Sequence, residues 1–156
     1  MQSNSKDQCD FIQSPPVLGN QFVQDRVLQS CLMRHLPQDM WARASSEFNR
    51  MGKLAAELYV QQLNEHQREP TLETWDAWGH RKDNINLTPL WEKARQIAAT
   101  HGLIATGYEG TFQPYARIVQ FALVYLFHAS SDFYTYPLTM TDGATRTLLD
   151  LSLIHI

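Results

Sequence analysis

Histidine and cysteine, the side chains that most often bind metals or act as nucleophiles, are scattered along this chain. Its six histidines and two cysteines lie in different segments, and Cys9 and Cys31 fit no spacing typical of a metal site or a redox pair. The sequence contains no HExxH motif and no G-x-S-x-G nucleophile elbow. It therefore indicates neither a metal centre nor an activated nucleophile, and free thiols in a reducing compartment are the simplest interpretation of the cysteines.

His128 has the most interesting position of the six histidines, because it separates two apolar segments. It follows residues 118–127, IVQFALVYLF, where only Gln120 interrupts an apolar run. A histidine at such a junction could transfer protons, but it could also cap a helix or make a structural hydrogen bond. We favour the structural role.

The segment after His128 combines aromatic residues with hydroxyls. Residues at spacings of three and four predict one face of a helix, and they are Phe133, Tyr136, Met140, Ala144 and Thr147. Pro137 and Gly143 fall inside the same pattern and cost about 3 and about 1 kcal/mol in a helix interior. We therefore expect a kinked, half-buried helix whose threonines, Thr135, Thr139, Thr141 and Thr145, bond back to their own turn.

Residues 118–127 form the element around which the rest of the chain is expected to pack. A helix here would be apolar on nearly every side, which is typical of a buried helix. The run is well short of the roughly 20 residues that a transmembrane helix needs. We interpret it as a core helix and expect no membrane role.

Upstream of the central run, the pattern predicts helices separated by proline. Asn20 is a candidate N-cap for a first helix that Pro37 ends, with an apolar stripe of Val23, Val27, Leu28, Cys31 and Leu32. Residues 38–67 give the longest helical pattern. Their packing face consists of Trp41, Ala44, Phe48, Met51, Ala55 and Leu58.

A different pattern covers residues 71–88, where Asn84 to Leu87 alternate polar and apolar side chains. This indicates a short β-hairpin turning near Trp78 and Gly79. Trp75 and Trp78 could stack on a ligand or cover a local apolar cluster, and we favour such a lid.

The remaining segments predict three more helix starts. Thr88 and Pro89 begin a helix that ends near His101, with a buried stripe of Leu90, Trp91, Ala94, Ile97 and Ala98. We expect a loop over residues 103–113, whose glycines do not have P-loop spacing. Thr111 and Pro114 are expected to start the central helix, and residues 130–132 to cap the last one.

The helical patterns predict a mainly α fold of about five helices, and the length allows one domain or part of a larger one. The chain has 156 residues, 44% hydrophobic and 19% charged, with a net charge of −3. Its 13 lysines and arginines are spread out, so nucleic-acid binding through this segment is not expected. Because the first residues show no targeting pattern, a cytoplasmic location is the default.

The ends of the chain look different from its middle. Residues 1–10 are polar, and we expect them to be disordered. Residues 151–156, LSLIHI, resemble a translated sequencing adaptor, and the preceding helix is still apolar. We therefore expect a domain over residues 11–150, truncated near Asp150, with an artefactual tail.

Four stretches together resemble a known family. They are QSPPVLGNQFVQD at 13–25, WDAWGHRKDNI at 75–85, HGLIATGYE at 101–109 and QFALVYLFHASSDFYTYPLTMTDGATR at 120–146. In the same order, they resemble the N-terminal helical domain of acyl-CoA dehydrogenases of the AidB, or adaptive-response, type. Where relatives commonly have Cys, Ala and Ala, this chain has Tyr136, Thr139 and Thr145.

The resemblance implies a larger flavoenzyme. Members have this helical domain, a middle β domain and a C-terminal helical domain, with FAD bound between the last two, and relatives are usually tetramers. A carboxylate base removes the α proton of the acyl-CoA, and the β hydride passes to the flavin. The flavin motif and the base have no match in this chain, so we expect it to bind no FAD and to be inactive by itself.

In related dehydrogenases the last N-terminal helix borders the acyl-chain pocket. By position, the resemblance implies possible acyl contacts at Tyr136, Thr139, Met140 and Gly143, although structural packing explains each equally well. A threonine at position 139 should narrow or polarise such a pocket, which leaves the preferred acyl chain open.

Three functions remain open from sequence. The first is part of an FAD-dependent acyl-CoA dehydrogenase-like oxidoreductase of lipid metabolism. The second is an AidB-type flavoprotein with a DNA-associated protective role, whose DNA contacts would lie elsewhere. The third is a free-standing helical interaction module, for which a cooperative melt of residues 1–150 would be supporting evidence.

Overall fold

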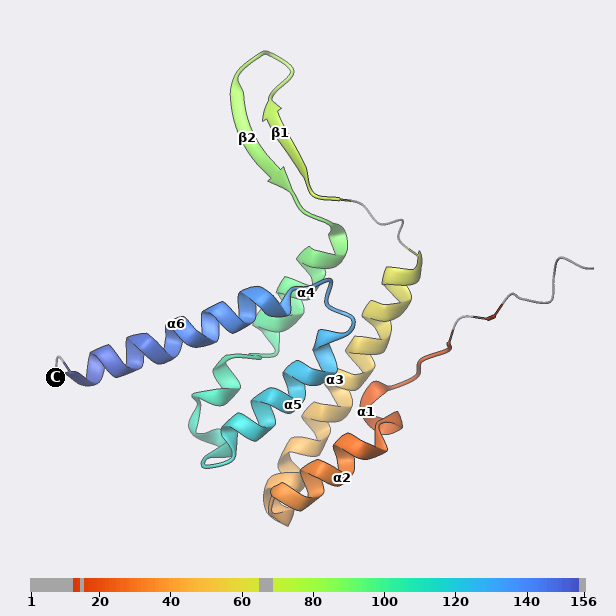
Figure 1. Cartoon of the computed structure of the whole chain (residues 1–156), viewed down its shortest axis with the longest axis vertical. Helices are drawn as coiled ribbons and strands as arrows, with labels where there is room; N and C mark the ends of the chain where they lie inside the picture. Colours follow the sequence, from red (N-terminus) through yellow and green to blue (C-terminus); the bar gives the residue numbers. More distant parts are fainter. Residues whose placement is uncertain (1–12, 15, 65–68, 155–156) are drawn as a thin grey trace, which may run out of the picture.

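The structure of the chain is a computed structural model that describes residues 13–14, 16–64 and 69–154. It is mainly helical, as the sequence predicts (Figure 1). In chain order, the elements are α1 (Gln21–Gln24), α2 (Arg26–His35), α3 (Gln38–Asn64), β1 (Thr71–Trp75), β2 (Arg81–Asn86), α4 (Pro89–Thr100), the 3₁₀ turns η1 (Ala105–Gly107) and η2 (Gly110–Phe112), α5 (Ala116–His128) and α6 (Thr135–Ile154). The expectation for residues 1–10 lies outside the described residues.

The core lies between α3 and α5, which run side by side (Figure 1). The α3 positions predicted to pack are buried, except that Trp41 is half-buried. On α5, the buried side chains recur at helical spacing, which places one face against the core. They are Ala116, Val119, Gln120, Ala122, Leu123, Leu126 and Phe127. The predicted core helix is therefore confirmed, and within the described residues no helix meets the length and apolarity needed to cross a bilayer.

The short helix α1 lies directly against α3 at Gly52. The Asn20 side chain caps α1 by accepting from the amides of Phe22 and Val23, as predicted, and its Nδ2 donates to the carbonyl of Asn49 at 2.9 Å. A Cβ added at Gly52 would lie 2.5 Å from the backbone nitrogen of Phe22. The two helices can therefore approach this closely only because position 52 has no side chain.

The predicted first helix is in fact two, and its predicted stripe is wrong at three of five positions. Asp25 leaves the helical conformation and caps α2, its Oδ1 accepting from the Leu28 amide at 2.8 Å. This break changes which side chains face inward. Phe22 and Leu32 are buried, whereas three members of the predicted stripe, Val23, Val27 and Cys31, are exposed.

The predicted hairpin is confirmed, but its tryptophans do not form a lid. Strands β1 and β2 pair antiparallel, with Leu72 opposite Ile85, and Gly79 turns the chain with a φ of 80°. The hairpin projects away from the helices (Figure 1). Because nothing in the described chain packs over it, Trp75 is exposed and Trp78 is 86% exposed.

Helix α4 follows its prediction, and the segment after it differs slightly. Thr88 accepts from the Trp91 amide at 3.0 Å and Pro89 occupies the first turn, while four members of the predicted stripe are buried and Trp91 is half-buried. The predicted loop contains η1 and η2. Since Thr111 belongs to η2, α5 begins at Ala116 rather than at Thr111 or Pro114.

Two predictions for α6 are wrong: its apolar face is not half-buried, and residues 130–132 do not cap it. It is continuous from Thr135, so Pro137 lies in the first turn, where a missing N–H costs no helical hydrogen bond. Its predicted apolar face is exposed. Ser130 and Ser131 are buried before the helix begins, and the Ser131 hydroxyl donates to the carbonyl of His128 at 2.9 Å, at the end of α5.

Candidate functional site

The four residues named from the sequence lie together on α6. Tyr136, Thr139, Met140 and Gly143 are spaced so that they share one side of the helix, which we call the outer face. All four are exposed, Tyr136 at 65% and Met140 at 76%. A Cβ added at Gly143 would have no neighbour within 4 Å. The described chain therefore brings these residues together on a surface that it leaves largely exposed.

An aromatic pair extends this surface toward the start of α6. The rings of Phe133 and Tyr136 lie 6.1 Å apart, centroid to centroid, and Phe133 is also exposed. Phe133 has a φ of 63°, a conformation that is uncommon for a bulky residue. The turn into α6 therefore adds a ring to the apolar part of the outer face.

The threonines of α6 contribute less polarity than their number indicates. The Thr139 hydroxyl donates to the carbonyl of Thr135 at 3.0 Å, and the Thr141, Thr145 and Thr147 hydroxyls donate to carbonyls four residues earlier. The prediction of back-bonded threonines is confirmed for Thr139, Thr141 and Thr145. Because these donors are already used within the helix, the outer face is mainly apolar.

Thr135 behaves differently from the other threonines, because its partner is His128. Thr135 Oγ1 and His128 Nδ1 lie 2.7 Å apart, joining the end of α5 to the start of α6. The structural hydrogen bond expected for His128 is therefore present. Beside this junction, the Thr88 hydroxyl donates to Asp132 Oδ2 at 2.9 Å, so the turn between the helices is also tied to the start of α4.

A second polar group lies under the middle of α6, and sequence analysis missed it. We call Tyr108, Arg117, Gln120 and Asp142 the polar clasp. Three donors converge on Asp142 Oδ1: Arg117 Nη1 and Tyr108 Oη, both at 2.7 Å, and Gln120 Nε2 at 3.3 Å. The guanidinium of Arg117 also stacks 4.4 Å from the Tyr108 ring centroid. The clasp joins η1, α5 and α6.

The clasp changes the titration of its members. Partial burial by itself raises the pKa of the Asp142 carboxyl, but the hydrogen bonds from Arg117, Tyr108 and Gln120 outweigh it, so the pKa lies below its ordinary value. Burial, together with the hydrogen bond to Asp142, raises the pKa of the Tyr108 hydroxyl. Asp142 is therefore an anion and Tyr108 a neutral donor at neutral pH.

One sequence signal pointed to the clasp. Gln120 is the polar interruption of the apolar run, and it is only 1% exposed, so it needs hydrogen-bond partners. It accepts from Arg117 Nη1 at 2.7 Å and donates to Asp142. Arg117 lies three residues earlier on the same helix, but Asp142 could not be identified by spacing, because it lies on another helix.

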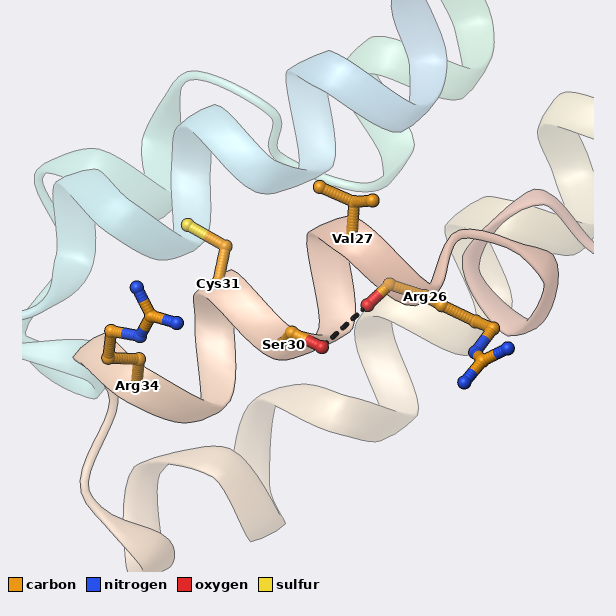
Figure 2. A pocket seen from close by; sticks show the side chains of 5 residues that line it. All are labelled: Arg26, Val27, Ser30, Cys31 and Arg34. Carbon is orange, nitrogen blue, oxygen red and sulfur yellow. Dashed lines mark hydrogen bonds between the residues drawn. The ribbon is translucent and has the colours of Figure 1, made fainter.

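The described chain has a shallow recess beside α2 and no cluster of metal ligands. Figure 2 shows a recess beside α2 in which Val27 and Cys31 point toward the neighbouring helix, with Arg26 and Arg34 at either end. The Ser30 hydroxyl donates to the Arg26 carbonyl at 2.8 Å, so it does not face the recess as a free donor. Within the described residues, no group of three or more His, Cys, Asp or Glu side chains could hold a metal ion.

The family resemblance implies a flavin as the cofactor of the complete protein. A flavin ring needs polar groups that are kept available for it. In the described part of the chain, every buried side-chain nitrogen and oxygen already has a hydrogen-bond partner. These buried side chains therefore hold no free polar group for a flavin, and we assign no flavin contact to them.

Comparison with known proteins places this geometry in context. Residues 13–154 match the family described as the adaptive response protein AidB N-terminal domain. The chain is 35% identical over 145 residues to acyl-CoA dehydrogenase family member 11 of Caenorhabditis elegans, a match that covers 92% of this chain and 24% of that protein. The chain thus spans about a quarter of the length of this curated relative.

Two solved structures have the same fold as this chain. The structure of Caenorhabditis elegans ACDH-11 in complex with C11-CoA superposes with a TM-score of 0.79 at 35% identity, covering 97% of this chain and 26% of that one. The apo form of Bd2924 superposes with a TM-score of 0.80 at 34% identity, covering 89% of this chain and 28% of that one.

Proposed function

The chain belongs to the acyl-CoA dehydrogenase family, as a domain of the AidB N-terminal type, and we propose that its outer face on α6 forms one wall of an acyl-chain pocket. The complete protein would be an FAD-dependent acyl-CoA dehydrogenase-like oxidoreductase of lipid metabolism. The family resemblance and the helical fold class predicted from the sequence are confirmed by the comparisons.

One observation carries this proposal: the outer face is mainly apolar, yet the described chain leaves it exposed. Leaving apolar area in water costs about 25 cal/mol per Å², so such a face is expected to have a partner. A related structure of the same fold holds C11-CoA, whose acyl chain is an apolar ligand of suitable chemistry. We infer that Tyr136, Thr139, Met140 and Gly143 contact the acyl chain.

The chemistry would be divided between this domain and the rest of the complete protein. The flavin would accept the hydride from the acyl group, and we assign it, with the base, to segments outside this chain. The residues described here would bind and orient the apolar tail and exclude water from it. We also propose that the complete protein is a homotetramer located in the cytoplasm.

The test measures acyl-chain selection in the complete protein with Met140→Trp. A tryptophan would fill the space along the outer face, so kcat/KM for long-chain acyl-CoA should fall about tenfold, while that for short chains should change little. The matched control is Met33→Trp, because Met33 is also exposed but lies on α2. Equal effects of both substitutions, or no effect of Met140→Trp, would contradict the assignment.

A further inference from the structure

Few side chains of α6 are buried, so apolar packing contributes little to holding this helix against the rest of the fold. From Thr135 to Leu151, only Thr135 and Leu138 are buried, Leu138 at 8% exposure. One buried leucine allows a helix to roll about its axis, because apolar contact has no direction. The orientation of α6 must therefore depend on its directional polar contacts.

Two such contacts hold the helix, and they lie two turns apart. The first is the bond between Thr135 and His128, at 2.7 Å, and the second is the clasp at Asp142. Seven residues separate Thr135 from Asp142, which is about 10 Å along a helix. Tyr136, Thr139 and Met140 lie between the two contacts, and Gly143 directly follows the second.

The clasp is well suited to fixing rotation, because its donors come from two different segments. Arg117 and Gln120 reach Asp142 from α5, while Tyr108 reaches it from the end of η1. Gln120 is held closely, since a Cβ added at Gly107 would lie 2.0 Å from its Oε1. If α6 rotated about its own axis, Asp142 would lose its hydrogen bonds to α5 or its hydrogen bond to Tyr108.

We propose that Asp142 is a positioning residue for acyl-chain selection: the polar clasp sets the rotation of α6 and hence the width of the pocket that the outer face borders. This inference rests on the function proposed above. Asp142 does not touch the acyl chain; it acts through the outer face. When an apolar pocket gains or loses room for one methylene group, kcat/KM for a substrate that needs this room changes by about tenfold.

The experiment compares Asp142→Asn with Asp150→Asn in the complete protein. Asp150 is a matched control because it lies on α6 and pairs with Arg146 at 2.8 Å on the exposed side. We expect Asp142→Asn to change the ratio of kcat/KM between long and short acyl-CoA by about tenfold, mainly through KM, and Asp150→Asn to leave the ratio unchanged. Tyr108→Phe removes a single donor and should change the ratio in the same direction, by less.

Hydrogen exchange of the backbone amides provides a second readout that does not depend on turnover. Asp142→Asn should raise exchange in α6 while leaving α3 unchanged. If the wild-type protein selects by chain length and neither Asp142→Asn nor Tyr108→Phe alters that selection, the inference is overturned while the proposed function stands. If the wild-type protein neither binds nor turns over acyl-CoA, the proposed function fails first and this inference fails with it. If Asp142→Asn unfolds the protein, Tyr108→Phe decides the outcome.

Discussion

Helices α5 and α6 follow each other in the chain and both carry large apolar side chains, but they are buried very differently. On α5, Val119, Leu123 and Phe127 lie at helical spacing and pack into the core that includes α3. On α6, Leu138 points inward while Tyr136 and Met140 are exposed. The two helices therefore differ in how much of their apolar surface the described chain covers.

Helices α5 and α6 are held to the rest of the fold by different kinds of contact. Helix α5 is held by buried area, which stabilises the fold by about 1.5–3 kcal/mol per large side chain. Helix α6 is held largely by the polar clasp and by the His128 to Thr135 contact. A helix that is held mainly by polar contacts, such as α6, can leave an apolar face uncovered for a ligand.

The largest effect is expected from deleting core volume on α5. Phe127 is fully buried, so Phe127→Ala should lower the free energy of unfolding by about 3–5 kcal/mol through lost transfer energy and a cavity. Chemical denaturation measures the change. The matched control is Phe121→Ala on the same helix, where the ring is exposed. Similar losses for both variants would contradict the assignment of the buried face of α5.

Adding volume at Gly52 tests the close contact between α1 and α3. Alanine normally favours a helix over glycine by about 1 kcal/mol, but a Cβ here would lie 2.5 Å from the Phe22 backbone. The clash should reverse the sign, so that Gly52→Ala destabilises the protein by about 1–3 kcal/mol. Thermal and chemical unfolding measure it. Gly143→Ala is the control, because that site is open and the substitution should stabilise α6.

Acid should weaken α6 before it weakens the core. The pKa of Asp142 is lowered in the folded protein, so the stability that this carboxylate contributes is present above about pH 4 and is lost as the pH falls below that value. The unfolding temperature should therefore fall less in Asp142→Asn than in the wild type between pH 6 and pH 3. Parallel pH profiles for the two proteins would show that Asp142 contributes nothing to this dependence.

The smallest effect on stability is expected at the outer face. Met140 is exposed, so Met140→Ser should change the free energy of unfolding by no more than about 0.5 kcal/mol. The same variant should bind long-chain acyl-CoA more weakly when tested in the complete protein. A large loss of stability would mean that Met140 packs against the fold and would remove it from the proposed pocket.

Much of the architecture could be predicted from local patterns. Helical spacing identified the packing face of α3 and the buried helix α5, while Asn20 and Thr88 were recognised as N-caps because their side chains bond within the next three residues. The hairpin and the back-bonded threonines of α6 were also predicted. These features depend on contacts between neighbours in the chain, which the sequence displays directly.

The failed predictions share a different physical cause. Asp25 falls inside the predicted first helix, but its carboxylate caps α2 and also accepts from the Tyr125 hydroxyl at 3.0 Å, a hundred residues away. Trp75 and Trp78 were predicted to cover a cluster, but no described segment lies beneath them. Whether an apolar residue is buried depends on which other segment reaches it.

The sequence by itself determined most of the helices, the Asn20 and Thr88 caps, the hairpin and the resemblance to one family. The tertiary structure decided that α6 presents Tyr136 and Met140 to the outside, and that Asp142 meets Tyr108, Arg117 and Gln120. The reason is that a helix pattern states which residues share a face, whereas the direction of that face is set by contacts with residues far away in the chain.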